Sequence, residues 1–334
     1  MTNSLVIAPQ WIGDAVMTEP LLRRLQARGE RLAVGALPWV APVYRAMPQV
    51  TEVIELPFQH GGLQFRARHA LAKRIEGRFD TAYVLPNSLK SALLPLLAGI
   101  PRRVGYLGEA RVGFLTHRLK NPGTKPPMVA FYSALSGEAG LDADRPRLQL
   151  PAGESEVALS AHGLVPGGYH VFAPGAEYGP AKRWPAAHFA TLAANLTRPV
   201  VLLGSGKEAA LCDEIAAAAG PGRCLNLAGK TPLLAAFALI ARARHVVSND
   251  SGLMHVAAAF GVPQVALFGS SSPLHTPPLN DLAQVLWLKQ QPDYQPPLDC
   301  SPCFSRECPL GHTRCLVDIA PGRVRQLLLS DAGG

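Results

Sequence analysis

Residues 5–16 read LVIAPQWIGDAV, and this stretch decides the fold class of the chain. The apolar run Leu5–Ala8 has the length and composition of a buried strand. A turn is expected at Gln10–Gly13, followed by a helical pattern that continues to about Arg28. A buried strand that turns directly into a helix begins a βαβ unit, which predicts a parallel sheet. Asp14 would then start the helix, either as an ordinary N-cap or as a polar group that faces a ligand.

The same pattern recurs along the chain, stops, and then restarts. Further strands are expected at residues 31–37, 52–56 and 81–85, and after the break at 169–173, 200–203, 245–248 and 264–268. Helical patterns separate the later strands, at residues 185–195, 208–218, 232–242 and 252–260. The break, residues 140–153, is rich in Pro, Gly and Asp and is typical of a linker. We therefore predict an α/β protein of two Rossmann-like domains, residues 1–153 and 154–334, whose parallel sheets are flanked by helices. Ligands are expected at the carboxyl ends of the strands and in the cleft between the domains.

Charge is distributed unevenly along the 334 residues. The chain carries a net charge of +8, and residues 60–125 alone contain twelve Lys and Arg against three Asp and Glu, a net charge of +9. Such a block attracts an anionic partner, such as a phosphorylated substrate, nucleic acid or an anionic bilayer, although it also suits solvated helix faces. The sequence shows no signal peptide and no run that reads as a membrane span, which predicts a cytoplasmic protein.

Two segments of the second half have the composition of phosphate-binding loops. Residues 174–185, PGAEYGPAKRWP, join a predicted strand to a helix and place two adjacent cations on a glycine-rich loop, which suits a diphosphate. Residues 247–255, VSNDSGLMH, also run from a strand into a helix, so the backbone amides from Ser251 onward would lie at a helix N-terminus. The alternatives are a basic surface loop and, for His255, a structural histidine.

Other motifs are weaker. Residues 202–208, LLGSGKE, imitate a dinucleotide fingerprint but lack its third glycine and its later acid, which argues against NAD. Gly229–Thr231 lacks the upstream glycine of a P-loop, because position 224 is Cys, which argues against ATP hydrolysis. The acidic pair Asp142 and Asp144 lies in the linker and reads as turn residues.

Six cysteines in a chain without an export signal suggest thiols or a metal site rather than disulfides. The cluster Cys300, Cys303, Cys308 and Cys315 either holds a structural zinc ion or forms a loop with free thiols. Neither arrangement supplies catalysis.

Taken together, the motifs resemble the ADP-heptose:lipopolysaccharide heptosyltransferases, an inverting glycosyltransferase family, and most closely their type II branch. The resemblance covers nearly the whole chain. It rests on segments in the same order and spacing: Trp11–Asp14, Pro86–Ala92, Arg102–Tyr106, Pro174–Pro185, Asn249–His255 and Cys300–Phe304.

The resemblance implies a GT-B fold of two facing Rossmann-like domains, the first binding the acceptor and the second binding ADP-heptose. It implies that Asp14 is the general base and that Lys182 neutralises the departing diphosphate, without a metal ion or another cofactor. The implied donor-binding residues are Gly13, Ala176, Glu177, Glu208, Thr231, Asp250, Ser251, Gly252 and His255. The implied acceptor-binding residues are Asn87, Lys90, Arg102 and Arg103.

The resemblance also implies the substrates and the location of the enzyme. The acceptor would be Kdo–lipid A that already carries one heptose, with its phosphates and carboxylates docked on the basic stretch. The enzyme would work at the inner face of the inner membrane as a peripheral protein. The last helix is expected to belong to the second domain; the alternative is that it packs back on the first domain.

Three other functions compete with this one. A sibling enzyme would add the first or a later heptose. A sugar-nucleotide epimerase shares the architecture but needs no basic acceptor surface. A nucleic-acid binder would need an aromatic and basic strand, a helix-turn-helix or a zinc finger, none of which the sequence contains.

Overall fold

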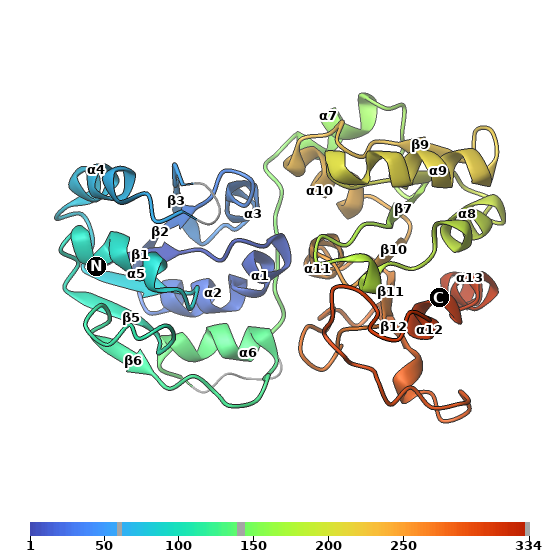
Figure 1. Cartoon of the computed structure of the whole chain (residues 1–334). Helices are drawn as coiled ribbons and strands as arrows, with labels where there is room; N and C mark the ends of the chain where they lie inside the picture. Colours follow the sequence, from blue (N-terminus) through green and yellow to red (C-terminus); the bar gives the residue numbers. More distant parts are fainter. Residues whose placement is uncertain (59–61, 139–143, 331–334) are drawn as a thin grey trace. The chain divides into compact units, whose positions relative to one another are not determined.

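The computed structural model describes residues 1–58, 62–138 and 144–330, and the chain divides into two compact units, Met1–Gln149 and Leu150–Gly334 (Figure 1). The division falls inside the segment 140–153 that the sequence indicates as a linker. Of the acidic pair in this segment, Asp142 lies outside the described residues, whereas Asp144 forms an ion pair with Arg24. Asp144 therefore has a structural partner within the first unit.

The first unit contains a six-stranded parallel sheet in the order β3-β2-β1-β4-β5-β6. Its strands are β1 (Thr2–Ile7), β2 (Glu30–Ala36), β3 (Val50–Glu55), β4 (Thr81–Val84), β5 (Arg102–Tyr106) and β6 (His117–Leu119). The predictions of the first four strands are confirmed, with ends that differ by at most three residues. The sequence pattern missed β5 and β6, because β5 opens with two arginines and β6 is a short strand with two exposed residues.

Helices cover the first sheet on both faces. They are α1 (Ile12–Met17), α2 (Glu19–Ala27), α3 (Ala41–Arg45), α4 (Phe65–Ile75), α5 (Leu89–Leu97) and α6 (Met128–Ser133), which continues into the 3-10 turn η1 (Ala134–Ser136). Helices α4 and α5 pack against each other over Leu5 and Ile7 of β1, whereas α2 packs against α6 and η1. Helix α1 begins at Ile12, so the turn expected at Gln10–Gly13 is shorter, at Gln10 and Trp11, and Gly13 lies in the first helical turn.

The second unit repeats the architecture with a parallel sheet in the order β12-β11-β10-β7-β8-β9. Its strands are β7 (His170–Ala173), β8 (Val200–Leu202), β9 (Cys224–Asn226), β10 (Val246–Asn249), β11 (Gln264–Phe268) and β12 (Ala283–Trp287). The four predicted strands are confirmed to within one residue, and β9 and β12 were missed. Both are partly exposed edge strands: β9 has only three residues, and β12 contains a glutamine and an exposed Val285 before its two buried residues.

The helices of the second unit include the four that the sequence predicted. The helices of this unit are α7 (Glu154–Ser160), α8 (Ala186–Ala194), α9 (Ala209–Ala219), α10 (Leu233–Ala241), α11 (Gly252–Ala259), α12 (Arg314–Val317) and α13 (Pro321–Ser330), and the predicted ones are α8 to α11. Helix α13 packs against α8 and β11 and buries Val324 and Leu328 in the core of this unit. The last helix therefore belongs to the second unit. In the described part of the chain, no helix combines the length and the apolar character needed to cross a membrane.

Each sheet has a topological switch point, where its first strand lies beside its fourth. In the first unit β1 pairs with β4, and in the second β7 pairs with β10. The connections leave such neighbouring strands in opposite directions, so a crevice opens at their carboxyl ends, where doubly wound folds bind ligands. Ligand sites are therefore expected in the segments that follow β1 and β4 and in those that follow β7 and β10.

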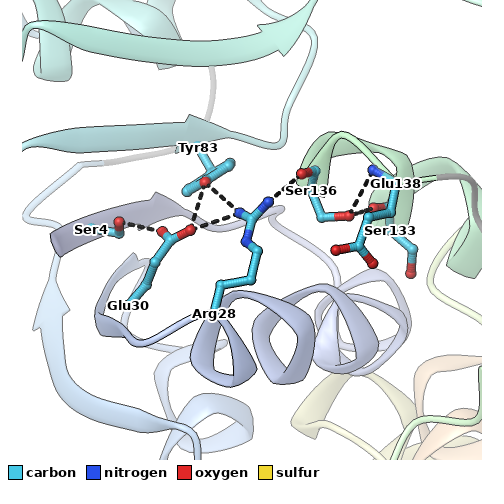
Figure 2. Close-up of polar contacts among 7 residues, drawn as sticks. All are labelled: Ser4, Arg28, Glu30, Tyr83, Ser133, Ser136 and Glu138. Atoms are coloured by element: carbon cyan, nitrogen blue, oxygen red, sulfur yellow. Dashed lines mark hydrogen bonds and ion pairs between the residues drawn. The ribbon is translucent and has the colours of Figure 1, made fainter. Parts of the chain in front are cut away.

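A polar network fixes the end of α6 in the first unit (Figure 2). The Arg28 guanidinium donates to Glu30 Oε1 at 2.7 Å, to the Tyr83 hydroxyl at 3.0 Å and to the Ser136 carbonyl oxygen. Ser4 donates to the other Glu30 oxygen at 2.6 Å. Arg28 thus joins the ends of α2 and η1 to the sheet.

We expect Arg28→Ala to lower the free energy of unfolding by about 2 kcal/mol, because the mostly buried Glu30 carboxylate and the Ser136 carbonyl both lose a charged donor. The matched control is Arg45→Ala, whose partner Glu55 is about half exposed, and it should cost less than about 1 kcal/mol. Urea denaturation measures both values. Equal losses would contradict a structural role for the Arg28 network.

Candidate functional site

A pocket of about 730 Å³ opens at the switch point of the first sheet. Its walls come from the segments that follow β1 and β4, together with α6. The lining consists of residues 9–11 and 14, residues 85–90, and Leu63, Glu109, Met128, Phe131 and Tyr132. The pocket therefore lies where the fold predicts a ligand site.

Asp14 lines this pocket from the first turn of α1, at the position that the sequence indicates. The Tyr132 hydroxyl donates to Asp14 Oδ1 at 3.0 Å. Burial raises the pKa of Tyr132 well above its usual value, and the charge of Asp14 raises it further. Tyr132 is therefore a neutral donor at physiological pH, and the carboxylate is the acceptor.

Of the four residues expected to bind the acceptor, the structure brings two to this pocket. Asn87 and Lys90 line it, from the segment that follows β4 and the first turn of α5. Arg102 and Arg103 begin β5, so they lie at the opposite edge of the parallel sheet from the carboxyl ends. Arg102 and Arg103 are therefore not grouped with Asn87 and Lys90, which corrects the grouping that the resemblance implied.

Several cations of the basic stretch are used inside the fold. Arg111 is fully buried and donates to the Pro86 and Tyr106 carbonyl oxygens, and Arg103 donates to the carbonyl oxygens of residues 100 and 114. Arg68 is also buried and lies 4.0 Å from the centre of the Phe58 ring. The cationic surface is thus smaller than the count of charges suggests.

In the second unit, the segments that follow β7 and β10 meet through an ion pair. Lys182, in the 3-10 turn η2 (Pro180–Lys182), donates from Nζ to Asp250 Oδ2 at 2.6 Å. The Asp250 side chain is almost fully buried and that of Lys182 is largely buried. The Tyr178 ring lies beneath two cations, 5.3 Å from Lys182 Nζ and 5.0 Å from the Arg306 guanidinium. A partly buried cation held on a glycine-rich loop can bind the phosphates of a nucleotide.

Asn249, the last residue of β10, holds both ends of the loop that carries Lys182. Its Nδ2 donates to the Pro174 carbonyl oxygen at 2.7 Å, and its Oδ1 accepts from the Trp184 amide at 3.0 Å. The buried Trp184 indole also donates to the Ile319 carbonyl oxygen at 2.9 Å. The loop is therefore anchored at both ends, and the lysine between them is positioned by the sheet.

The remaining residues expected to bind the donor follow the carboxyl ends of β7 to β10, with the exception of Gly13, which is buried in α1 of the first unit. Ala176 is buried in the loop after β7, and Glu177 pairs with Lys207 at 2.6 Å. Glu208 is buried, accepts from the Ser205 amide at 2.8 Å, and packs so tightly on Gly175 that a β-carbon there would lie 2.5 Å from its Cγ. Thr231 follows β9, in a loop that touches the one after β8.

Ser251, Gly252 and His255 lie at the start of α11. Ser251 precedes the helix in an extended conformation, so the amides of Gly252 and its neighbours begin the helix. His255 is buried, which lowers its pKa to about 4, and the nearby Lys182 lowers it as well, against the opposing effect of Asp250. His255 is therefore neutral at pH 7 and shapes the site without adding charge.

The cysteine cluster belongs to the second unit, in a cavity that Ala181, the neighbour of Lys182, also lines. Cys300, Cys303, Cys308 and Cys315 line one small cavity, and all six cysteines have free thiols. Within residues 1–58, 62–138 and 144–330, no three His, Cys, Asp or Glu side chains are arranged to hold a metal ion. The segment that carries the cysteines also supports the Lys182 loop, since the Arg306 carbonyl oxygen accepts from the Ala181 amide at 3.0 Å, next to Lys182.

Sequence reasoning missed Tyr132, Tyr178 and the anchoring role of Asn249. Asn249 was part of a quoted motif, and its position at the end of a strand was the available signal. Tyr132 lies 118 residues from Asp14 in the chain, and no local pattern marks the short helix that contains it.

Two doubly wound units in tandem, each with ionisable groups at its switch point, are the architecture of GT-B glycosyltransferases and of some sugar-nucleotide epimerases. The pattern of glycosyltransferase family 9 (heptosyltransferase) matches residues 68–314. The chain is 41% identical to lipopolysaccharide heptosyltransferase 2 of Escherichia coli over 97% of each chain, and 40% identical to lipooligosaccharide heptosyltransferase 2 of Haemophilus influenzae over 86% of this chain and 88% of the relative. The structure of the E. coli ADP-heptose LPS heptosyltransferase II superposes with a TM-score of 0.84 and 40% identity, over 99% of this chain and 100% of that chain. The chain belongs to glycosyltransferase family 9, the heptosyltransferases.

We expect Asn249→Ala to release the loop 174–184, because the Trp184 amide and the Pro174 carbonyl both lose their partner. Hydrogen–deuterium exchange at the Trp184 amide should become at least tenfold faster, which corresponds to about 1.4 kcal/mol of lost protection. Asn280→Ala is the control, since Asn280 likewise bonds one carbonyl and one amide, but in another loop. Equal exchange at Trp184 in wild type and Asn249→Ala would remove Asn249 from the organisation of the site.

Proposed function

We propose that the protein transfers heptose from ADP-L-glycero-D-manno-heptose to the first heptose of the Kdo–lipid A inner core, with inversion at the anomeric carbon. The observation that carries the proposal is a carboxylate in an open pocket at one switch point and an anchored lysine at the other. The relatives at about 40% identity support it, because those quoted above are named heptosyltransferase 2 or II.

On the acceptor side, Asp14 acts as the general base. The acceptor hydroxyl gives its proton to the Asp14 carboxylate while its oxygen forms a bond to the anomeric carbon of the donor. The bond between that carbon and the phosphate oxygen breaks, and ADP leaves with the electron pair. Asn87 and Lys90, which line the same pocket, bind the acceptor's polar groups.

On the donor side, the charge that develops on the departing diphosphate is neutralised by Lys182. The amides at the start of α11 donate to the same group. The buried Ser251 hydroxyl has no hydrogen-bond partner within the described residues, and an oxygen atom of ADP-heptose would supply one. Ala176, Glu177, Glu208 and Thr231 complete the nucleotide site at the ends of β7, β8 and β9. With Lys182 supplying the positive charge, the reaction needs no metal ion or other cofactor.

The proposed acceptor rests on the names of the relatives. The chemistry does not decide it, because a sibling enzyme that adds the first or a later heptose would use the same reaction. Family membership sets the epimerase alternative aside. The phosphates of the acceptor lie at a membrane surface, so we further propose that the enzyme contacts the anionic inner face of the inner membrane peripherally, through cations of the first unit.

The direct test supplies ADP-heptose with Kdo–lipid A acceptors that carry zero, one or two heptoses, and reads the products by mass. We expect the mass of one heptose to be added to the acceptor that carries one, and the addition to survive EDTA. Addition only to the heptose-free acceptor would assign the first transfer instead, and a strict magnesium requirement would contradict the role of Lys182.

Two variants separate the proposed roles. Asp14→Asn should reduce kcat by at least about 100-fold and leave the Kd of ADP-heptose within a few-fold, because the base acts only on the acceptor proton. Lys182→Ala should also lose about 100-fold in kcat, through weaker stabilisation of the leaving group, whereas Lys289→Ala, an exposed cation of the same unit, should keep wild-type turnover. Full activity of Asp14→Asn, measured by initial rates, would exclude that carboxylate as the base.

A further inference from the structure

Tyr132 is a buried polar group of the first-unit pocket for which the transfer reaction described above has no role. Its side chain is 4% exposed, and its hydroxyl donates to Asp14 Oδ1 at 3.0 Å. A buried phenol that stays protonated can only donate its hydrogen to this carboxylate, so one Asp14 oxygen is fixed in direction.

The ring of Tyr132 is held in place by its neighbours. Phe131 packs edge-on against it, with ring centroids 5.6 Å apart, and Tyr106 of β5 stacks on Phe131 at 4.0 Å. The Tyr106 hydroxyl also donates to the Phe131 carbonyl oxygen at 2.7 Å. These contacts connect the hydroxyl that reaches Asp14 to the sheet itself.

The turn η1, which continues α6, is fixed as well. Ser136, four residues after Tyr132, accepts from the Arg28 guanidinium, and the Ser136 hydroxyl donates back to the Ser133 carbonyl oxygen at 2.8 Å (Figure 2). Glu30 and Tyr83 hold Arg28 in turn. Contacts at Phe131, Tyr132 and Ser136 therefore hold the C-terminal half of α6 and the turn η1 that follows it.

We propose that Tyr132 is a positioning residue for Asp14: its hydroxyl directs the carboxylate into the acceptor pocket and keeps it ionised there. This inference rests on the proposed function, in which Asp14 is the base. Hydrogen bonding to the charged form of a carboxylate favours that form. Fixing one oxygen also leaves the other in a constant orientation toward the acceptor hydroxyl, which is what a general base needs.

Other ionisable groups near Asp14 come from three elements. Tyr44 of α3 interacts electrostatically with Asp14, and burial raises its pKa, so it stays neutral. Lys90 of α5 and Glu109 line the same pocket and carry opposite charges. Among the described contacts, the Tyr132 hydroxyl bonds Asp14 directly, and its removal should therefore be visible in the titration of Asp14.

The test is Tyr132→Phe, which removes one oxygen and keeps the ring. We expect kcat at saturating substrates to fall about tenfold, with the KM of ADP-heptose unchanged. Transfer requires ionised Asp14, so the rate falls as the pH falls through the pKa of the base. Loss of the donor raises that pKa, and the acidic limb of the kcat profile should move to higher pH by about half a unit or more.

Tyr44→Phe is the matched control. Thr18 donates to the Ala15 carbonyl oxygen, so the Tyr44 hydroxyl donates to Thr18 at 3.2 Å. The control thus removes an equally buried hydroxyl from the same unit, but one that bonds a threonine, and its pH profile should superimpose on that of the wild type.

The outcomes separate this inference from the proposed function. A shifted limb in Tyr132→Phe alone supports the positioning role. A lower kcat with an unshifted limb marks a merely structural tyrosine and overturns the inference, as do profiles that coincide in all three proteins. Failure of the wild type to transfer heptose in the same assay overturns the proposed function instead.

Discussion

The pairing of β1 with β4, and of β7 with β10, is the constraint on which the rest of the molecule depends. In a parallel sheet the carboxyl ends of all strands lie on one edge. Where the connections of two neighbouring strands leave in opposite directions, a crevice opens at that edge. Four residues follow these strands and are brought to such crevices by the order of the strands: Asp14, Lys90, Lys182 and Asp250. Side chains then refine what the sheets have placed.

The refinement is done by buried polar contacts, and it takes the same form in both units. Asn249 fixes the ends of the Lys182 loop, and Tyr132 holds Asp14. Each is a neutral side chain largely removed from water, where leaving a hydrogen bond unmade is costly. The Asp250 carboxylate pairs with the largely buried Lys182 ammonium, which offsets the cost of removing either charge from water.

Sequence reasoning predicted the strands that are continuous apolar runs, such as Leu5–Ala8 and Gln264–Phe268, and the loops that directly follow them. It missed β5, because Arg102 and Arg103 interrupt the apolar pattern. The resemblance assigned these arginines to the acceptor, but they begin β5 and so lie at the opposite edge of the sheet from the pocket residues that follow β1 and β4. Tyr132 could not have been found, because its contact with Asp14 depends on how α6 packs against α1 and not on any local pattern.

The central claim is that each substrate binds at the switch point of its own unit. Hydrogen exchange measured with ADP alone, and separately with the acceptor alone, tests it most directly. ADP should slow exchange in residues 174–185 and 250–259 and leave residues 9–17 and 86–97 unchanged, and the acceptor should do the reverse. Protection of residues 9–17 by ADP, with none in the loop that carries Lys182, would contradict the account.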